Sequence, residues 1–193
     1  MWEKDQSSFH LRCEEGRNPL HCAVSIGHLE GVNFLLEKFR SAAYQRDRNG
    51  FFPIHIASDE GYINIIQEFL WNCPDSRELL NRQGQNILHL AAKRGRIQVV
   101  NYILKVPTLQ NLINERDENG NTPLFLATIN QRPEVVSVLT WDRRVNLQLM
   151  NKDGLTALDI AQEYNTDTQI TTSFPEVCDS AENIFILFLS AAI

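Results

Sequence analysis

The chain has 193 residues, of which 43% are hydrophobic and 22% are charged, and its formal net charge is −6. This balance supports a hydrophobic core in one domain, or two at most, and excludes a disordered, collagen-like or polytopic membrane chain. An acidic chain is also a poor ligand for nucleic acid, because binding to phosphates needs a basic surface.

The N-terminus and the cysteines indicate a cellular compartment. Residues 1–6 contain no apolar run of the kind found in a secretory signal, so we expect an intracellular, cytoplasmic chain. The cysteines are scattered without a C-x-x-C pair, which predicts reduced thiols that pack as small buried hydrophobic side chains. They are Cys13, Cys22, Cys73 and Cys178.

A seven-residue phrase recurs along the chain after a glycine. These glycines are Gly16, Gly50, Gly84, Gly120 and Gly154, at steps of 34, 34, 36 and 34 residues. The phrases are RNPLHCA at 17–23, FFPIHIA at 51–57, QNILHLA at 85–91, NTPLFLA at 121–127 and LTALDIA at 155–161. Five copies at one period indicate a stack of repeated units.

Each phrase carries the signals that begin and end a short helix. Side chains able to cap a helix N-terminus are Asn18, Asn86, Thr122 and Thr156. Proline stands at the expected first helical position in Pro19, Pro53 and Pro123. The first helix is expected to end at Gly27, Gly61 and Gly95, because glycine adopts a left-handed C-terminal conformation at little cost.

A second helix is expected in each unit, with one apolar stripe. The stripes comprise Leu29, Val32, Leu35 and Leu36; Ile63, Ile66, Phe69 and Leu70; and Ile97, Val100, Ile103 and Leu104. One helix pair cannot bury such a stripe alone, so neighbouring units must stack. Tight turns are predicted at 47–50, 81–84, 117–120 and 151–154, where Asp or Asn precedes the glycine by three residues.

The phrases resemble the T-P-L-H-x-A signature of the ankyrin repeat over about residues 13–165. The resemblance implies an all-α fold, a solenoid of about five stacked helix-turn-helix repeats with short finger turns. The expected divisions are an extension at 1–12, repeats at 13–46, 47–80, 81–116, 117–150 and 151–165 (partial), and a tail at 166–193. Both ends are expected to be cut from a longer array.

Several residues depart from the repeat pattern. Phe52 replaces an N-cap residue, which should cost about 1 kcal/mol of local helix stability. Phe125 stands at the histidine position and Gln131 at the terminating glycine. The segment 165–175 has threonines and a proline instead of an apolar stripe, so no regular second helix is predicted there.

The tail ends in the apolar run 184–193, within the segment 181–193. A helix needs about 20 apolar residues to span a bilayer, so this run cannot cross one alone. Three interpretations remain open. The segment covers the exposed face of the last repeat, begins a cut membrane segment, or hangs free.

The recurring histidines His21, His55 and His89 do not predict a metal site. Equivalent positions in stacked helical repeats lie about 8–10 Å apart, whereas zinc ligands all lie about 2 Å from one ion. We expect these histidines to form hydrogen bonds between adjacent repeats. No catalytic motif is present, so neither an enzyme nor a cofactor is expected.

The ankyrin resemblance implies a binding surface made of finger tips and the exposed side of the first helices. Carried over by position, the expected contacts are Arg48, Phe51, Phe52, Asp59, Arg82, Gln85, Lys93, Arg94, Glu118, Asn121, Lys152 and Leu155. Their charges alternate in sign without a continuous basic stripe, which again disfavours nucleic acid. The expected ligand is a folded protein or a peptide, and the chain itself is expected to be a monomer.

Aromatic and arginine side chains carry most of the energy of protein interfaces, which favours Phe51 and Phe52 as anchors. The group Arg82, Lys93 and Arg94 is a second expected contact, for an acidic segment. The alternative is that Phe52 packs into its own repeat and that the charges are only solvated surface.

Phrases such as 84–89 and 152–161 also resemble the plant membrane-anchored ankyrin proteins of the accelerated-cell-death type. That family implies a role in defence and stress signalling, with an ankyrin array before a block of membrane helices that is absent here. Three hypotheses follow: an interaction scaffold, a membrane-associated relative tethered by its apolar tail, and a remnant of a longer gene.

Overall fold

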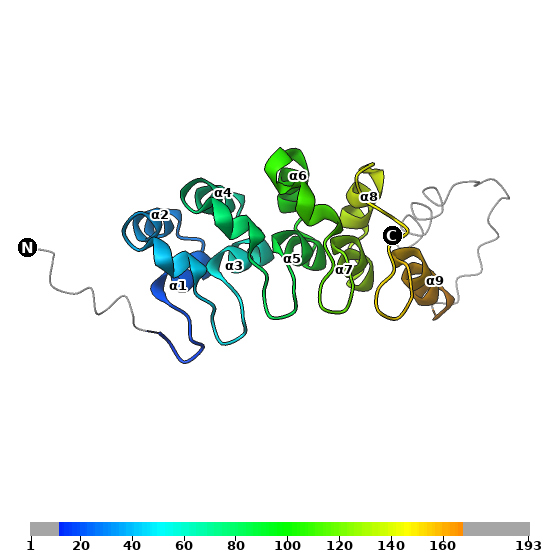
Figure 1. Cartoon of the computed structure of the whole chain (residues 1–193), viewed down its shortest axis with the longest axis horizontal. Helices are drawn as coiled ribbons and strands as arrows, with labels where there is room; N and C mark the ends of the chain where they lie inside the picture. The colour runs from blue at the N-terminus through cyan, green and yellow to red at the C-terminus, as the bar shows by residue number, and fades with distance from the viewer. Residues whose placement is uncertain (1–11, 168–193) are drawn as a thin grey trace, which may run out of the picture.

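Two layers of helices run along residues 12–167, the part of the chain that the computed structural model describes (Figure 1). The inner layer, beside the finger loops, contains α1 (Pro19–Ser25), α3 (Pro53–Glu60), α5 (Ile87–Arg94), α7 (Pro123–Ile129) and α9 (Ala157–Asp167). The outer layer contains α2 (Leu29–Lys38), α4 (Ile63–Asn72), α6 (Ile97–Lys105) and α8 (Pro133–Trp141). Short 3-10 helices follow three of the outer helices: η2 (Arg40–Tyr44), η3 (Pro74–Glu78) and η4 (Pro107–Asn114).

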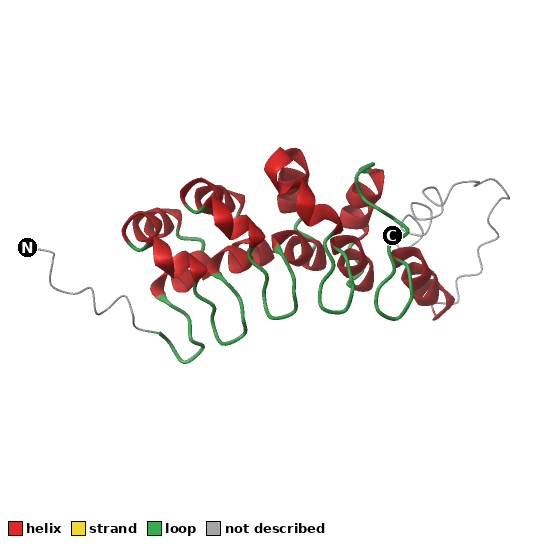
Figure 2. Cartoon of the chain, in the orientation of Figure 1, coloured by secondary structure: helices red, strands yellow, loops and turns green. Residues whose placement is uncertain are grey.

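The predicted fold class is confirmed, since residues 12–167 contain helices and loops but no strand (Figure 2). Each inner helix packs against the next inner helix, and the outer helices pack in the same sequence. The molecule is therefore a helical solenoid in which neighbouring repeats bury one another's apolar faces.

The predicted helix starts are confirmed at Asn18, Asn86 and Thr156. The Asn18 and Asn86 side chains accept hydrogen bonds from backbone N–H groups three residues later at 3.0 Å, and Thr156 Oγ1 does so at 3.2 Å. Thr122 is also the N-cap residue of α7, as predicted, but its side chain makes no capping bond. Its backbone is still extended, and Pro123 begins α7 without an N–H to satisfy, so the turn forms without the cap.

The inner helices end largely as predicted. Gly61 and Gly95 cap α3 and α5 in the left-handed conformation, with φ of 89° and 71°. Gly27 has a φ of 69° but lies one residue beyond the C-cap of α1. Gln131 also adopts a positive φ, 52°, and no other non-glycine residue within 12–167 does so. Such a conformation costs on the order of 1–3 kcal/mol for a residue with a Cβ.

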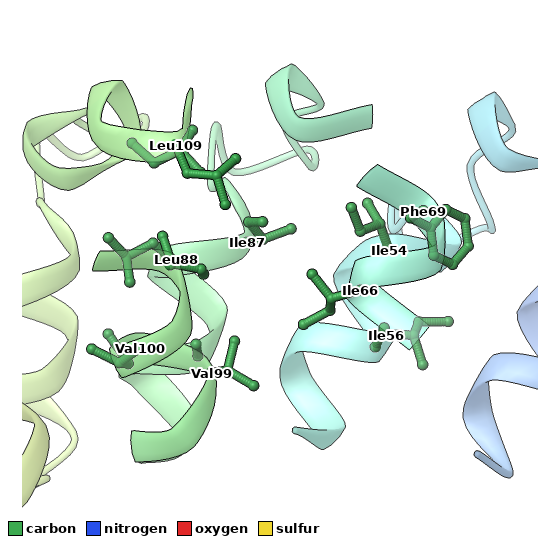
Figure 3. Packing of buried hydrophobic residues seen from close by; sticks show 14 of the residues in the cluster. Ile54, Ile56, Ile66, Phe69, Ile87, Leu88, Val99, Val100 and Leu109 are labelled. Atoms are coloured by element: carbon green, nitrogen blue, oxygen red, sulfur yellow. The ribbon is translucent and has the colours of Figure 1, made fainter. Parts of the chain in front are cut away.

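The core lies between the two layers (Figure 3). Ile54, Ile66 and Phe69 form one cluster with no exposed area. In the following repeat, Leu88 on α5 lies near Val100 on α6. The predicted stripes are confirmed, because their members are either buried or packed against this core.

The cysteines correct one prediction. Cys73 is buried, but Cys13 and Cys22 are exposed. Cys22 occupies the position of Ile56 and Leu90, which are buried because inner helices pack on both sides of α3 and α5. Within the described residues α1 has an inner neighbour on one side only. The predictions for Cys178 and for the tail segment 181–193 lie outside the described residues.

Candidate partner-binding surface

The fingers are ordered by a side-chain bond at each tip. Asp117 Oδ1 accepts hydrogen bonds from the N–H groups of Asn119 and Asn121, each at 2.9 Å. Asp47, Asn81 and Asn151 make bonds of the same kind, which confirms the predicted turns. Backbone bonds of 2.8–2.9 Å also join neighbouring fingers: Arg48 N to Glu15 O, Glu118 N to Gln83 O, and Lys152 N to Asn119 O.

The histidines connect the inner helices to the loops that follow. In His55 and His89 the Nδ1 atom accepts a hydrogen bond from the N-cap N–H, at 3.2 and 3.3 Å. The Nε2 atom must then carry the proton and donates it to Leu79 O and Asn121 O respectively, each at 3.0 Å. His21 Nε2 lies 3.1 Å from Phe51 O in the same way. The predicted bonds between repeats are therefore present for His21 and His89. The His55 bond to Leu79 lies within the repeat 47–80.

This arrangement keeps the histidines neutral. Burial lowers the pKa of His55 and of His89 from 6.5 to about 4, although the backbone carbonyl that each contacts acts in the opposite direction. Burial also lowers the pKa of His21. Both ring nitrogens of His55 and His89 are occupied by backbone groups, so neither is free to bind a metal. Within residues 12–167 no group of three or more His, Cys, Asp or Glu side chains is placed to hold a metal ion.

The structure divides the sequence-predicted contact residues by exposure. The exposed ones are Arg48, Arg82, Arg94, Glu118 and Lys152. The half-buried ones are Phe51, Asp59, Lys93 and Leu155. The buried ones are Phe52, Gln85 and Asn121, which are 7%, 6% and 7% exposed.

Two of these buried residues, Phe52 and Gln85, hold the fingers in place. Phe52 packs against the ring of His55, and the Arg46 guanidinium lies 4.9 Å from the centre of the Phe52 ring. Gln85 Nε2 donates to Asp117 Oδ2 of the next finger at 3.2 Å. In this conformation these side chains support the surface from beneath it.

Two contact residues that the sequence treats separately are paired in the structure. Arg94 Nε donates to Asp59 Oδ1 at 2.8 Å across neighbouring repeats, and this bond raises the pKa of Arg94. Arg96 Nη2 lies 3.6 Å from Glu60 Oε2 and forms a second ion pair between the same two repeats. Arg96 and Arg132 were missed by the sequence reasoning, although both stand twelve residues after a finger glycine. Their shared position in the repeat was the available signal.

A family model described as "Ankyrin repeats (3 copies)" matches residues 3–78 and 54–151. The chain belongs to the ankyrin-repeat family. As an ankyrin-repeat array it is a scaffold for protein interactions, and nothing in residues 12–167 points to catalysis.

Two proteins of Saccharomyces cerevisiae share part of this ankyrin-repeat sequence. Oxysterol-binding protein homolog 2 is 38% identical over 58 residues, and Oxysterol-binding protein homolog 1 is 36% identical over 53 residues. These matches cover 30% and 28% of this chain and 4% of each yeast protein. The chain therefore spans a small fraction of the curated relatives that it matches.

Proposed function

We propose that this ankyrin-repeat chain binds a folded protein or a peptide through its finger tips and inner helices. We further propose that it acts as a cytoplasmic scaffold in signalling or in a stress or defence response. The yeast relatives are named for oxysterol binding, but the matched share of those proteins is too small to bring a sterol into the proposal.

One observation carries the proposal. Exposed charged residues stand at equivalent finger-tip positions in successive repeats, and backbone bonds hold neighbouring fingers together. They are Arg48, Arg82, Glu118 and Lys152. Rigid side-chain placement lowers the entropy lost when a partner binds, and a row with charges of both signs favours a partner with a complementary pattern over a uniformly charged one.

Phe51 is the proposed aromatic anchor beside this row. It is half-buried, with its ring 6.2 Å from the His55 ring in an edge-on geometry, so part of the ring is available to a partner. Partly packed aromatic side chains make good contact residues because little rotamer freedom remains to be lost.

The experiment immobilises the wild-type chain and a double variant, Phe51→Ala with Arg48→Ala, and compares the amount of partner that each captures. We expect the captured partner to fall at least about tenfold, as loss of an interface anchor implies. The matched control is Trp71→Ala with Arg77→Ala, because Trp71 is 85% exposed at the end of α4 in the outer layer. Thermal melts check that each variant folds. Unchanged capture by a folded Phe51/Arg48 variant would contradict the proposed surface.

The second candidate is a membrane-associated relative of the plant ankyrin proteins, tethered through its tail. The apolar run 184–193 supports it. Among residues 12–167, no helix combines the length and the apolar character that crossing a bilayer requires.

Membrane fractionation in cells, together with a thermal melt, separates the two candidates when the whole chain is compared with a version ending at Asp179. If only the whole chain sediments with membranes, the tail is an anchor. If both stay soluble and the shorter chain melts at a lower temperature, the tail covers the array and the membrane candidate fails.

A further inference from the structure

A pocket opens at the corner between α7 and α8. Arg94 and Gly95, at the end of α5, form one side of it. Gln131, Arg132 and Glu134 form the other side. We refer to these five residues as the α7–α8 pocket. None of them except Arg94 belongs to the surface expected from the sequence.

The pocket exists because the corner differs from those before it. At the corners of Gly61 and Gly95 an arginine stem from the following repeat lies over the glycine: Arg96 Cδ is 3.2 Å, and Arg132 Cδ 2.9 Å, from where a Cβ would stand. At the first corner the Tyr62 ring covers Gly27 in the same way. In the next repeat α9 continues through residue 166, the equivalent position, without turning there. Gln131 stands where the other corners have glycine. Its side chain is exposed.

The guanidinium groups in the pocket have unused donors. Arg132 Nε donates to Lys93 O at 3.2 Å, and Arg94 Nε donates to Asp59. Each guanidinium has five N–H donors, and no other hydrogen bond of either group is present within residues 12–167. Neither Arg132 nor Glu134 forms an ion pair in that part of the chain.

The charge around the pocket is opposite in sign to that of the whole chain. Asp59 and Glu60 are paired with Arg94 and Arg96, which leaves Glu134 as the unpaired acidic group. The pocket, together with the charged residues that hydrogen bonds and ion pairs link to it, carries four cations against three anions, whereas the chain has a net charge of −6. The four cations are Lys93, Arg94, Arg96 and Arg132, and the three anions are Asp59, Glu60 and Glu134.

We infer that the α7–α8 pocket binds a side-chain carboxylate from an acidic segment of the protein partner. The inference rests on the proposed function and adds the chemistry of the partner. Two guanidinium groups with free N–H donors suit a carboxylate, which accepts paired hydrogen bonds in the plane of a guanidinium. Glu134 limits the affinity, because its negative charge lies beside the bound carboxylate.

The probe is a fluorescent hexaglutamate peptide with an acetylated N-terminus and an amidated C-terminus, titrated against the full chain and followed by fluorescence anisotropy. Arg132→Gln should weaken binding about tenfold at low ionic strength, because a charge-assisted hydrogen bond is lost. Glu134→Gln should strengthen binding about threefold, because a like charge is removed. Arg77→Gln, on η3 at the outer edge, should leave binding unchanged and serves as the matched control.

Arg132 also covers Gly95, so Arg132→Gln can lower stability. Glu134→Gln removes only an exposed charge and keeps the inference testable if the first variant unfolds. Equal affinity for hexaglutamate in the wild type and in the Glu134→Gln variant would overturn the inference, as would equal binding of a capped hexaglutamine. If the Phe51→Ala, Arg48→Ala variant loses partner capture but the pocket substitutions leave hexaglutamate binding unchanged, the proposed function stands and the inference fails. If hexaglutamate binding follows the pocket charges but the finger variants keep their partner, the pocket stands and the finger surface fails.

Discussion

Repeats three and four have the same backbone plan but hold their neighbours differently. In repeat three, Asn86 caps α5 and His89 donates to the next finger. In repeat four, Thr122 makes no capping bond, and the histidine is replaced by Phe125, which is 1% exposed. A polar connection between repeats is thus exchanged for apolar packing at the same place.

The corners that follow α5 and α7 also differ in what the next repeat places over them. Gly95 is covered by Arg132 from the following repeat, whereas Gln131 is exposed and lies in the α7–α8 pocket. The difference shows that the residue at this position depends on what the next repeat places over it, as well as on the left-handed backbone that ends the helix. Where the next repeat changes, the signature residue changes with it.

Acidification should produce the largest effect. The pKa values of His55 and His89 lie near 4 in the folded chain and near 6.5 in the unfolded chain, so the unfolded chain binds more protons between these values. The free energy of unfolding should therefore be constant above about pH 6.5 and fall as the pH drops towards 4, by up to about 3 kcal/mol for each histidine. Urea unfolding followed by circular dichroism at several pH values measures it.

His89→Phe sharpens this prediction by making repeat three resemble repeat four. The variant should be less stable at pH 7, because Asn121 O loses its donor, but should lose roughly half of the dependence on pH. A pH dependence equal to that of the wild type would show that His89 is not neutral in the folded chain.

Asn86→Ala should have the next largest effect and lower the free energy of unfolding by about 3 kcal/mol. The Asn86 side chain caps α5 and also donates to Leu112 O at 3.2 Å and to Glu115 Oε2 at 2.6 Å. Thr122→Ala should cost only about 1 kcal/mol, for the buried methyl group, because Thr122 makes no cap. Chemical denaturation measures both variants. An equal loss of unfolding free energy in the two would contradict the difference between repeats three and four.

The corner substitutions should have the smallest effects and opposite signs. Gly95→Ala should destabilise the chain by about 1–2 kcal/mol, because a Cβ meets the Arg132 stem and the left-handed backbone is strained. Gln131→Gly should stabilise it by about 0.5 kcal/mol, since the relieved strain exceeds the entropy gained by the unfolded chain. Melting temperatures of the two variants test this, and two shifts in the same direction would contradict it.

The sequence predicted most of the fold because repetition made each signal appear several times. The period placed the fingers, the asparagine caps placed helix starts at Asn18 and Asn86, and the stripes placed the core around Ile66 and Phe69. The bonds of His21 and His89 to the following repeat also followed, since a buried polar group needs a hydrogen-bond partner.

The rest depended on contacts between repeats, which a single sequence does not display. The exposure of Cys22 comes from the neighbour that α1 lacks within the described residues, and the burial of Gln85 comes from its bond to Asp117. The pairing of Asp59 with Arg94 joins residues 35 positions apart. The only sign of the positive φ of Gln131 in the sequence is that glycine is absent from this position.

Amide hydrogen exchange of the full chain, with and without its captured partner, tests the central claim that binding lies on the fingers and inner helices. The surface proposed here predicts slower exchange in the fingers at 47–52 and 81–86 and in the corner at 129–135, with the outer helices α2, α4 and α6 unchanged. Slower exchange confined to the outer helices would contradict it.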